Sequence, residues 1–246
     1  MNTSKHPSVA EFRLSDFPAI LFDMDGVITP TAEVHMRAWD RMFTEFLTER
    51  GISEPYTDHD YFDYVDGKPR YEGVDSFLKS RGIDLPWGEK TDAPSTETVC
   101  GLGNRKNDLV LTLLREEGVQ PYPGTVALLD SLADDVRIAV VSSSRNAEEV
   151  LSAAGLLDRF GVIVDGNVAE REGLPGKPAP DTFVHAAQQL GADPATTLVV
   201  EDAVSGVRAG AAGPFAAVLG VNRGVGAEKL YAAGATLVVD DLGVLA

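Results

Sequence analysis

The sequence has little cysteine, no long apolar run and few basic residues, and each scarcity excludes a class of protein. Cys100 is the only cysteine in 246 residues, which excludes an internal disulfide and any metal site built from cysteines. This usage fits a reducing compartment, so we expect a cytoplasmic protein. No run reaches the roughly 18 apolar residues of a membrane span, and residues 1–16 lack the apolar segment of a signal peptide. We therefore expect no membrane association.

The shortage of positive charge limits the partners of the chain. The 38 acidic residues outnumber the 21 Lys and Arg residues, which gives a formal net charge of −17 at pH 7. Such a chain has no basic stripe to replace the counterions of nucleic acid, so we expect no nucleic-acid partner. An anionic substrate must then be held by a few local cations, which makes Lys and Arg residues near polar motifs informative.

A short apolar run followed by two acids is the most informative feature that is present. Residues 19–22 read as a buried strand that ends in Asp23 and Asp25, followed by Gly26. Ligands bind beyond the carboxyl ends of the strands in open α/β sheets. Gly26 permits the positive φ that lets the two acids converge. Taken alone, the run could also be a strand capped by an Asx turn.

Further polar side chains follow apolar runs later in the chain. Strand-like runs precede Ser142 and the pair Glu201 and Asp202, and Lys177 lies between them in a loop rich in Gly and Pro. Because parallel strands end at the same edge of a sheet, we expect these side chains to share one site. Each also has a simpler explanation. Ser142 could be a helix N-cap, Lys177 a solvated surface residue, and the acids ordinary charge at a helix N-terminus.

These motifs, in this order, resemble those of the haloacid dehalogenase-like phosphotransferase superfamily over residues 18–240. The resemblance implies that Asp23 is a nucleophile that forms an aspartyl-phosphate, and that Asp25 is the general acid and base. It further implies that Ser142 and Lys177 bind the phosphoryl group in transfer. A Mg²⁺ cofactor would be bound by oxygen ligands from Asp23, from the backbone carbonyl of Asp25, and from Glu201 and Asp202.

The hydrophobic pattern predicts an α/β fold, with a Rossmann-like parallel sheet core and a small inserted helical cap domain. Residues 31–51 form an amphipathic helix, and no strand-like run follows until residue 136. Gly and Pro breaks divide the stretch between them into helical segments at 58–65, 69–81, 93–102 and 104–118. We expect a flexible polar leader at 1–16, a catalytic core formed by 17–30 and 118–246, and the cap at 31–117.

Within the superfamily, the sequence resembles the β-phosphoglucomutase family. The first motif continues to His35 in a way that resembles the hinge and first cap helix of that family. The resemblance implies substrate contacts from the first cap helix, two further cap elements and one core loop, namely His35, Gly67, Arg70, Lys106, Ser144, Arg145 and Asn146. Arg70 and Lys106 could instead be exposed helix residues, and His35 a packed hinge residue. Trp39 is expected in the core.

Two places depart from the pattern of that family. Pro30 stands where the family carries an acidic residue at the hinge, so movement of the cap could be tuned differently. The segment 166–176, before Lys177, is longer and richer in glycine, which predicts a longer loop. Such a loop could reshape the rim of the site and change the range of substrates.

The leading functional hypothesis is the interconversion of β-D-glucose 1-phosphate and glucose 6-phosphate through an aspartyl-phosphate and β-glucose 1,6-bisphosphate. A mutase must bind a sugar bisphosphate in two orientations, so it needs a second anion site that a monophosphatase does not need. The alternatives are a Mg²⁺-dependent sugar-phosphate phosphatase with the same core motifs and, more remotely, a non-catalytic binding module. We expect a monomer that acts on a small phosphosugar.

Overall fold

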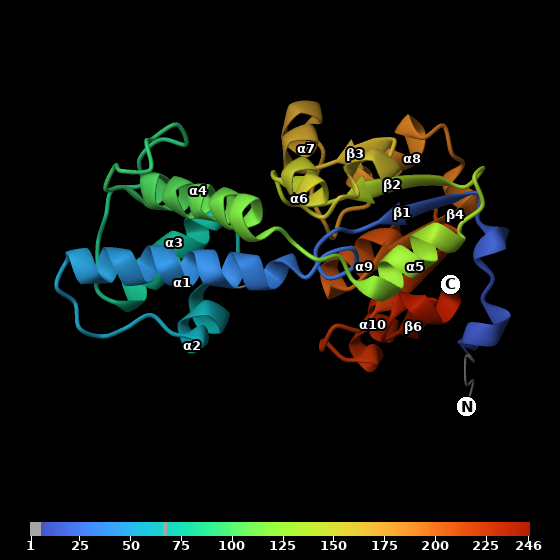
Figure 1. The fold of residues 1–246 in the computed structure, drawn as a ribbon, viewed down its shortest axis with the longest axis horizontal. Coiled ribbons are helices and arrows are strands. Elements are labelled where there is room, and N and C mark those ends of the chain that lie inside the picture. Colours follow the sequence, from blue (N-terminus) through green and yellow to red (C-terminus); the bar gives the residue numbers. More distant parts are fainter. Residues whose placement is uncertain (1–5, 66–67) are drawn as a thin grey trace. The chain divides into compact units, whose positions relative to one another are not determined.

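The chain forms two compact units. The computed structural model describes residues 6–65 and 68–246. One unit, which we call the core, consists of Met1–Thr31 and Val119–Ala246, and the other, which we call the cap, consists of Ala32–Gly118. Figure 1 follows the chain through both units. No helix in the described ranges is long and apolar enough to cross a membrane.

The core is built on a parallel sheet of six strands in the order β3-β2-β1-β4-β5-β6 (Figure 1). The strands are β1 (Ala19–Phe22), β2 (Arg137–Val141), β3 (Val162–Val164), β4 (Thr197–Glu201), β5 (Ala217–Val221) and β6 (Leu237–Val239). The chain runs from β1 outward to β3 and then returns to β4 on the other side of β1. Ligands bind at such a reversal of strand order, outside the carboxyl ends of the strands. The predicted α/β fold class is confirmed.

The α-helices of the core lie between these strands in the chain. In the described part they are α5 (Pro123–Ser131), α6 (Ala147–Ala153), α7 (Gly166–Glu172), α8 (Asp181–Gln189), α9 (Val204–Ala212) and α10 (Ala227–Ala233). One expectation was wrong here. The glycine-rich segment 166–176 is not all loop, because Asp165 caps α7 by accepting the backbone N–H groups of Asn167 and Val168.

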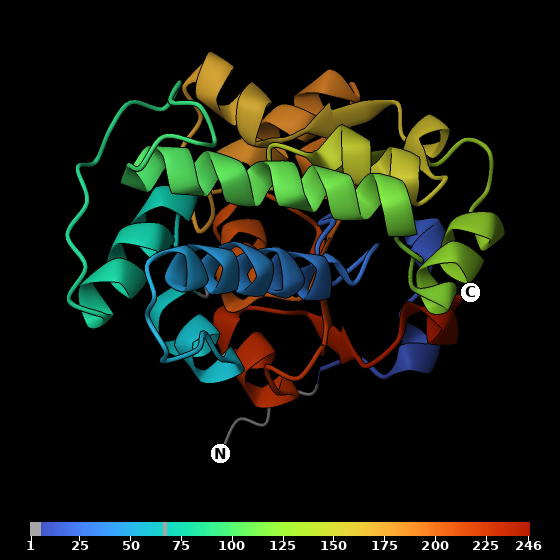
Figure 2. The same ribbon diagram turned by 60° about the vertical axis from the view of Figure 1, so that its left-hand side comes forward.

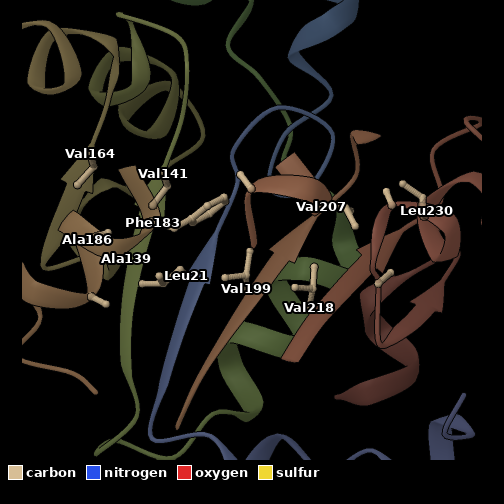
Figure 3. Close-up of a cluster of buried hydrophobic side chains, with 14 residues drawn as sticks. Leu21, Ala139, Val141, Val164, Phe183, Ala186, Val199, Val207, Val218 and Leu230 are labelled. Carbon is tan, nitrogen blue, oxygen red and sulfur yellow. The ribbon is translucent and has the colours of Figure 1, made fainter. Parts of the chain in front are cut away.

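The hydrophobic core explains why the central strand reads as an unbroken apolar run. All four residues of β1 are fully buried, as expected for a parallel strand covered on both faces. On one face, Leu21 belongs to a cluster with Phe183 of α8 and Val207 of α9 (Figure 3). Phe22, which points to the other face, meets the ring of Phe160 edge-on at 6.2 Å. Each such buried side chain stabilises the fold by about 1.5–3 kcal/mol.

The described part of the cap is helical. Its helices are α1 (Thr31–Glu49), α2 (Asp58–Asp60), the π-helical turn Tyr61–Val65, α3 (Arg70–Ser80) and α4 (Val99–Glu117). The first residue of α1, Thr31, is also the last residue of the first core segment. Helices α1 and α4 lie side by side in both views (Figures 1 and 2). The rings of Trp39 and Phe43 stack at 5.3 Å, and both are buried, so Trp39 belongs to the hydrophobic interior of the cap, as expected.

The prediction of two helices at 93–102 and 104–118 was wrong. Residues 99–117 form the single helix α4, whose start is capped by Thr98 through a 2.9 Å hydrogen bond from the backbone N–H of Gly101. Gly103 does not break the helix. A side chain there would come within 2.6 Å of the Tyr71 ring, so this glycine permits close packing of α3 against α4. Cys100 is buried in the same helix.

Candidate active site

The acids predicted from the sequence gather at the carboxyl ends of β1 and β4, the two strands at the switch point. The backbone N–H of Asp23 donates to the carbonyl of Val200 at 2.9 Å, which joins the two strand ends. Asp23 is 6% exposed and Glu201 is 1% exposed. One ligand atom from each of Asp23, Glu201 and Asp202 lies within 4.8 Å of the others. This group of oxygen ligands has the composition of a metal site.

Lys177 enters this group of acids as its counter-charge. Its Nζ donates to Oδ1 of Asp23, to Oε1 of Glu201 at 2.7 Å and to the carbonyl of Val141 at 3.1 Å. Its side chain is 8% exposed and its Nζ lies 4.9 Å from the centre of the Phe183 ring. Lys177 is therefore no solvated surface residue. Burial lowers the pKa of Lys177, but the charges of Asp23 and Glu201 outweigh burial and raise it.

The carboxylates of the site are held in an environment that disfavours their charge. Burial raises the pKa of Asp23 well above its usual range, and the charge of Lys177 only partly opposes this. Burial, with the nearby charges of Glu201 and Asp25, raises the pKa of Asp202 to about 7. A divalent cation would relieve this excess of negative charge, and an all-oxygen ligand set suits a hard ion. The residues present therefore fit a divalent metal ion.

Asp25 stands apart from the three-residue metal group. Its Oδ1 accepts a hydrogen bond from the hydroxyl of Thr31, and its Oδ2 accepts one from the hydroxyl of Ser142 at 3.4 Å. The intervening loop is closed by the backbone N–H of Gly26, which donates to the carbonyl of Thr29 at 2.8 Å. Gly26 has a φ of +83°, as its role in the turn requires. That the backbone carbonyl of Asp25 binds metal stays a prediction.

Several residues of this site were missed by sequence reasoning. Thr31 is one, and its only signal is a hydroxyl at the first residue of a helix. Gly206 is another, because any side chain there would collide with the Glu201 carboxylate, just as one at Gly26 would collide with Asp202. Arg223 is a third, since its Nε donates to the Gly26 carbonyl at 2.8 Å. Thr31 therefore contacts Asp25 directly, Gly206 leaves room for the Glu201 carboxylate, and Arg223 contacts the turn that follows Asp25.

The loop of residues 142–146 follows β2, and we call it the substrate loop because the sequence predicts that it binds substrate. Ser142 is buried and its Oγ accepts the backbone N–H of Ser144 at 3.0 Å. The Oγ of Ser144 in turn accepts the backbone N–H of Asn146 at 3.2 Å. Ser142 is thus not the N-cap of α6, which is Asn146. The guanidinium of Arg145 is half exposed and pairs with the carboxylate of Glu170 at 2.8 Å.

In the cap, Lys106 and His35 are brought together although they are far apart in the sequence. Lys106 is 5% exposed, so the exposed-helix explanation fails for it. Its Nζ lies 2.6 Å from Nδ1 of His35 and 4.8 Å from the centre of the Trp39 ring. Burial, with the charges of Lys106 and Arg70, lowers the pKa of His35 to about 3, so its ring is neutral at physiological pH.

Arg70 begins α3 and is half-buried rather than free on the surface. Its Nη2 donates to Oδ1 of Asn107 in α4 at 2.7 Å, and its guanidinium lies 6.0 Å from the centre of the Tyr71 ring. The guanidinium is therefore oriented by neighbours on two helices. Gly67, predicted to bind substrate beside Arg70, lies outside the described residues.

Comparisons with known proteins identify the family. Residues 17–213 match the haloacid dehalogenase-like hydrolases. The chain is 48% identical to a β-phosphoglucomutase of Mycobacterium tuberculosis over 238 residues, which cover 92% of this chain and 90% of that protein. It is 35% identical to the β-phosphoglucomutase of Bacillus subtilis over 84% of each chain. The crystal structure of the Clostridium difficile β-phosphoglucomutase superposes with a TM-score of 0.71 and 27% identity, covering 94% of this chain and 93% of that one. The chain belongs to the β-phosphoglucomutase family of the haloacid dehalogenase-like hydrolases.

Proposed function

We propose that this protein is a phosphotransferase that interconverts β-D-glucose 1-phosphate and glucose 6-phosphate through β-glucose 1,6-bisphosphate. The observation that carries the choice of reaction is the 48% identity to a β-phosphoglucomutase over 92% of the chain. The core motifs alone would serve a phosphatase equally well, because both reactions pass a phosphoryl group through an aspartate.

In this proposal Asp23 is the nucleophile. One of its carboxylate oxygens attacks phosphorus, a P–O bond to the sugar breaks, and an aspartyl-phosphate forms. Asp25 acts on the sugar oxygen: it takes the proton when a sugar hydroxyl attacks the aspartyl-phosphate and returns a proton when that oxygen leaves. The hydrogen bonds from Thr31 and Ser142 to the two oxygens of Asp25 support this role, because they hold the carboxyl in one orientation.

The surrounding side chains stabilise the charge on the phosphoryl group in transfer. Lys177 contacts the proposed nucleophile and Glu201 at once, so its ammonium partly offsets the burial that raises the pKa of Asp23. We assign Mg²⁺ to the site, bound by Asp23, Glu201 and Asp202 with the backbone carbonyl of Asp25. When bound, the ion supplies positive charge to the equatorial phosphoryl oxygens. When the phosphoryl group is bound, the hydroxyl of Ser142 turns its one hydrogen from Asp25 to a phosphoryl oxygen.

The mutase reaction requires that the second phosphate and the sugar be bound as well. We assign the second phosphate to Arg70, Ser144, Arg145 and Asn146, since a guanidinium binds phosphate through a bidentate fork. Lys106 and His35 are assigned to the sugar hydroxyls. A neutral His35 next to the Lys106 ammonium supports this assignment, because the pair offers a fixed arrangement of donors.

The test compares one substrate that needs the second anion site with one that does not. Arg70→Ala should lower kcat/KM for bisphosphate-primed β-glucose 1-phosphate by about 30-fold to several thousand-fold, the cost of losing a buried charged contact of about 2–5 kcal/mol. Hydrolysis of acetyl phosphate should change little, since it has a single phosphate. Arg41→Ala is the matched control, because Arg41 is a half-exposed cap residue paired only weakly with Glu45. Equal losses on both substrates, or no loss on either, would favour the phosphatase.

A further inference from the structure

Helix α7 lies in the segment that departs from the family pattern, and it contacts the substrate loop at several points. The backbone N–H of Gly166 donates to the carbonyl of Ser144 at 2.9 Å. The side-chain Nδ2 of Asn167 donates to the carbonyl of Arg145 at 2.8 Å. The two contacts fall on consecutive carbonyls of the loop, so the first turn of α7 supports the loop backbone where Arg145 is attached.

The first turn of α7 is itself held rigidly. Asp165 is 6% exposed, and its carboxylate accepts the backbone N–H of Asn167 at 3.0 Å and that of Val168 at 2.8 Å. It also accepts the Nδ2 of Asn167 at 2.8 Å, which fixes the direction of the amide. Gly166 also packs tightly against the substrate loop. A Cβ at Gly166 would lie 2.9 Å from the carbonyl oxygen of Ser143.

The next turn of α7 meets the side chain of Arg145 rather than its backbone. The carboxylate of Glu170 pairs with the guanidinium at 2.8 Å, with 45% of the Arg145 side chain and 54% of the Glu170 side chain exposed. A half-exposed ion pair of this kind is weak and exchanges readily with other anions. A phosphate dianion carries more charge than the carboxylate and offers the same bidentate acceptor geometry. It can therefore displace Glu170 from Arg145.

We propose that α7 sets the affinity of the substrate loop for the non-reacting phosphate, through two positioning residues with opposite effects. Asn167 holds the loop backbone in place and favours phosphate binding. Glu170 competes with the phosphate for Arg145 and disfavours binding. The inference rests on the proposed function, in which Arg145 binds the second phosphate of the sugar bisphosphate.

The test measures KM and kcat for bisphosphate-primed β-glucose 1-phosphate in three single variants. Asn167→Ala should raise KM by about 2- to 10-fold, the worth of one hydrogen bond, with kcat little changed. Glu170→Gln should lower KM by about 2- to 5-fold, because the competing charge is gone. The matched control is Glu172→Gln, also on α7, where the half-exposed glutamate pairs with Arg171 at 3.0 Å and not with the loop. It should leave KM unchanged.

A general loss of stability cannot raise KM in Asn167→Ala and lower it in Glu170→Gln. A rise of KM in Glu170→Gln, or equal effects of Glu170→Gln and Glu172→Gln, would overturn the competition. An Asn167→Ala variant that loses acetyl phosphate hydrolysis as much as it loses mutase activity would overturn the support role. Failure of the proposed function looks different, because the wild-type protein would then yield no glucose 6-phosphate at all.

Discussion

Removal of the Lys177 ammonium should destabilise the protein, because the acids of the cluster then repel one another without a counter-charge. In Lys177→Met, the carboxylates of Asp23 and Glu201, with side chains 8% and 1% exposed, lose the group that both contact. Two unit charges about 4 Å apart interact by about 4 kcal/mol at an effective dielectric near 20. Breaking a buried pair by removing one partner costs about 3–5 kcal/mol. We therefore expect the free energy of unfolding to fall by about 3–5 kcal/mol at pH 8 without metal.

The loss of stability in Lys177→Met should be larger at pH 8 than at pH 5. Without Lys177, the folded pKa of Asp23 rises further above its unfolded value, so the folded state holds a proton that the unfolded state has lost. Stability then falls as pH rises through that window. Urea unfolding at pH 5 and pH 8 measures this, with Lys229→Met as the control because Lys229 is an exposed lysine of the core. A deficit below about 1 kcal/mol at pH 8, or an equal one at both pH values, would refute the reasoning.

The remaining predictions concern the nucleophile and the metal. Asp23→Asn should abolish turnover while the protein stays folded, whereas Asp25→Asn should slow transfer by about 10²- to 10⁴-fold; substantial activity in purified Asp23→Asn would exclude covalent catalysis by this residue. EDTA should stop turnover, and added Mg²⁺ should raise the melting temperature with concentration. That rise should be larger at pH 8 than at pH 6, because Asp202, with a pKa of about 7, must lose its proton to bind the ion. A rise that is the same at both pH values would contradict the role of Asp202.

The parts of the fold that could be predicted from the sequence are those determined by the pattern of neighbouring residues. Strand β1 is buried on both faces and so reads as an unbroken apolar run, and the acids after it follow in the next three residues. Helix α4 could not be predicted as one helix, because Gly103 serves a contact with Tyr71 from another helix. In α7, the glycines suggested a loop, but the cap from Asp165 starts a helix there.

In the site, too, single residues could be predicted from local sequence, whereas contacts between residues far apart in the sequence could not. The acids were predicted from their places after strands and Lys177 from its place in a loop rich in Gly and Pro, but their mutual contacts depend on the strand order of the finished sheet. The contact between Lys106 and His35 joins residues 71 positions apart, and no periodicity indicates it. The hydrogen bond from Thr31 to Asp25 depends on the turn at Gly26, so the two residues meet only when that loop has closed.

The product formed from β-glucose 1-phosphate distinguishes a mutase from a phosphatase. The purified protein is supplied with Mg²⁺ and a trace of β-glucose 1,6-bisphosphate, and ³¹P NMR follows every phosphorus species. We expect glucose 6-phosphate to replace the substrate mole for mole, with no matching release of inorganic phosphate. Free glucose and an equal amount of inorganic phosphate would contradict it and identify the protein as a phosphatase.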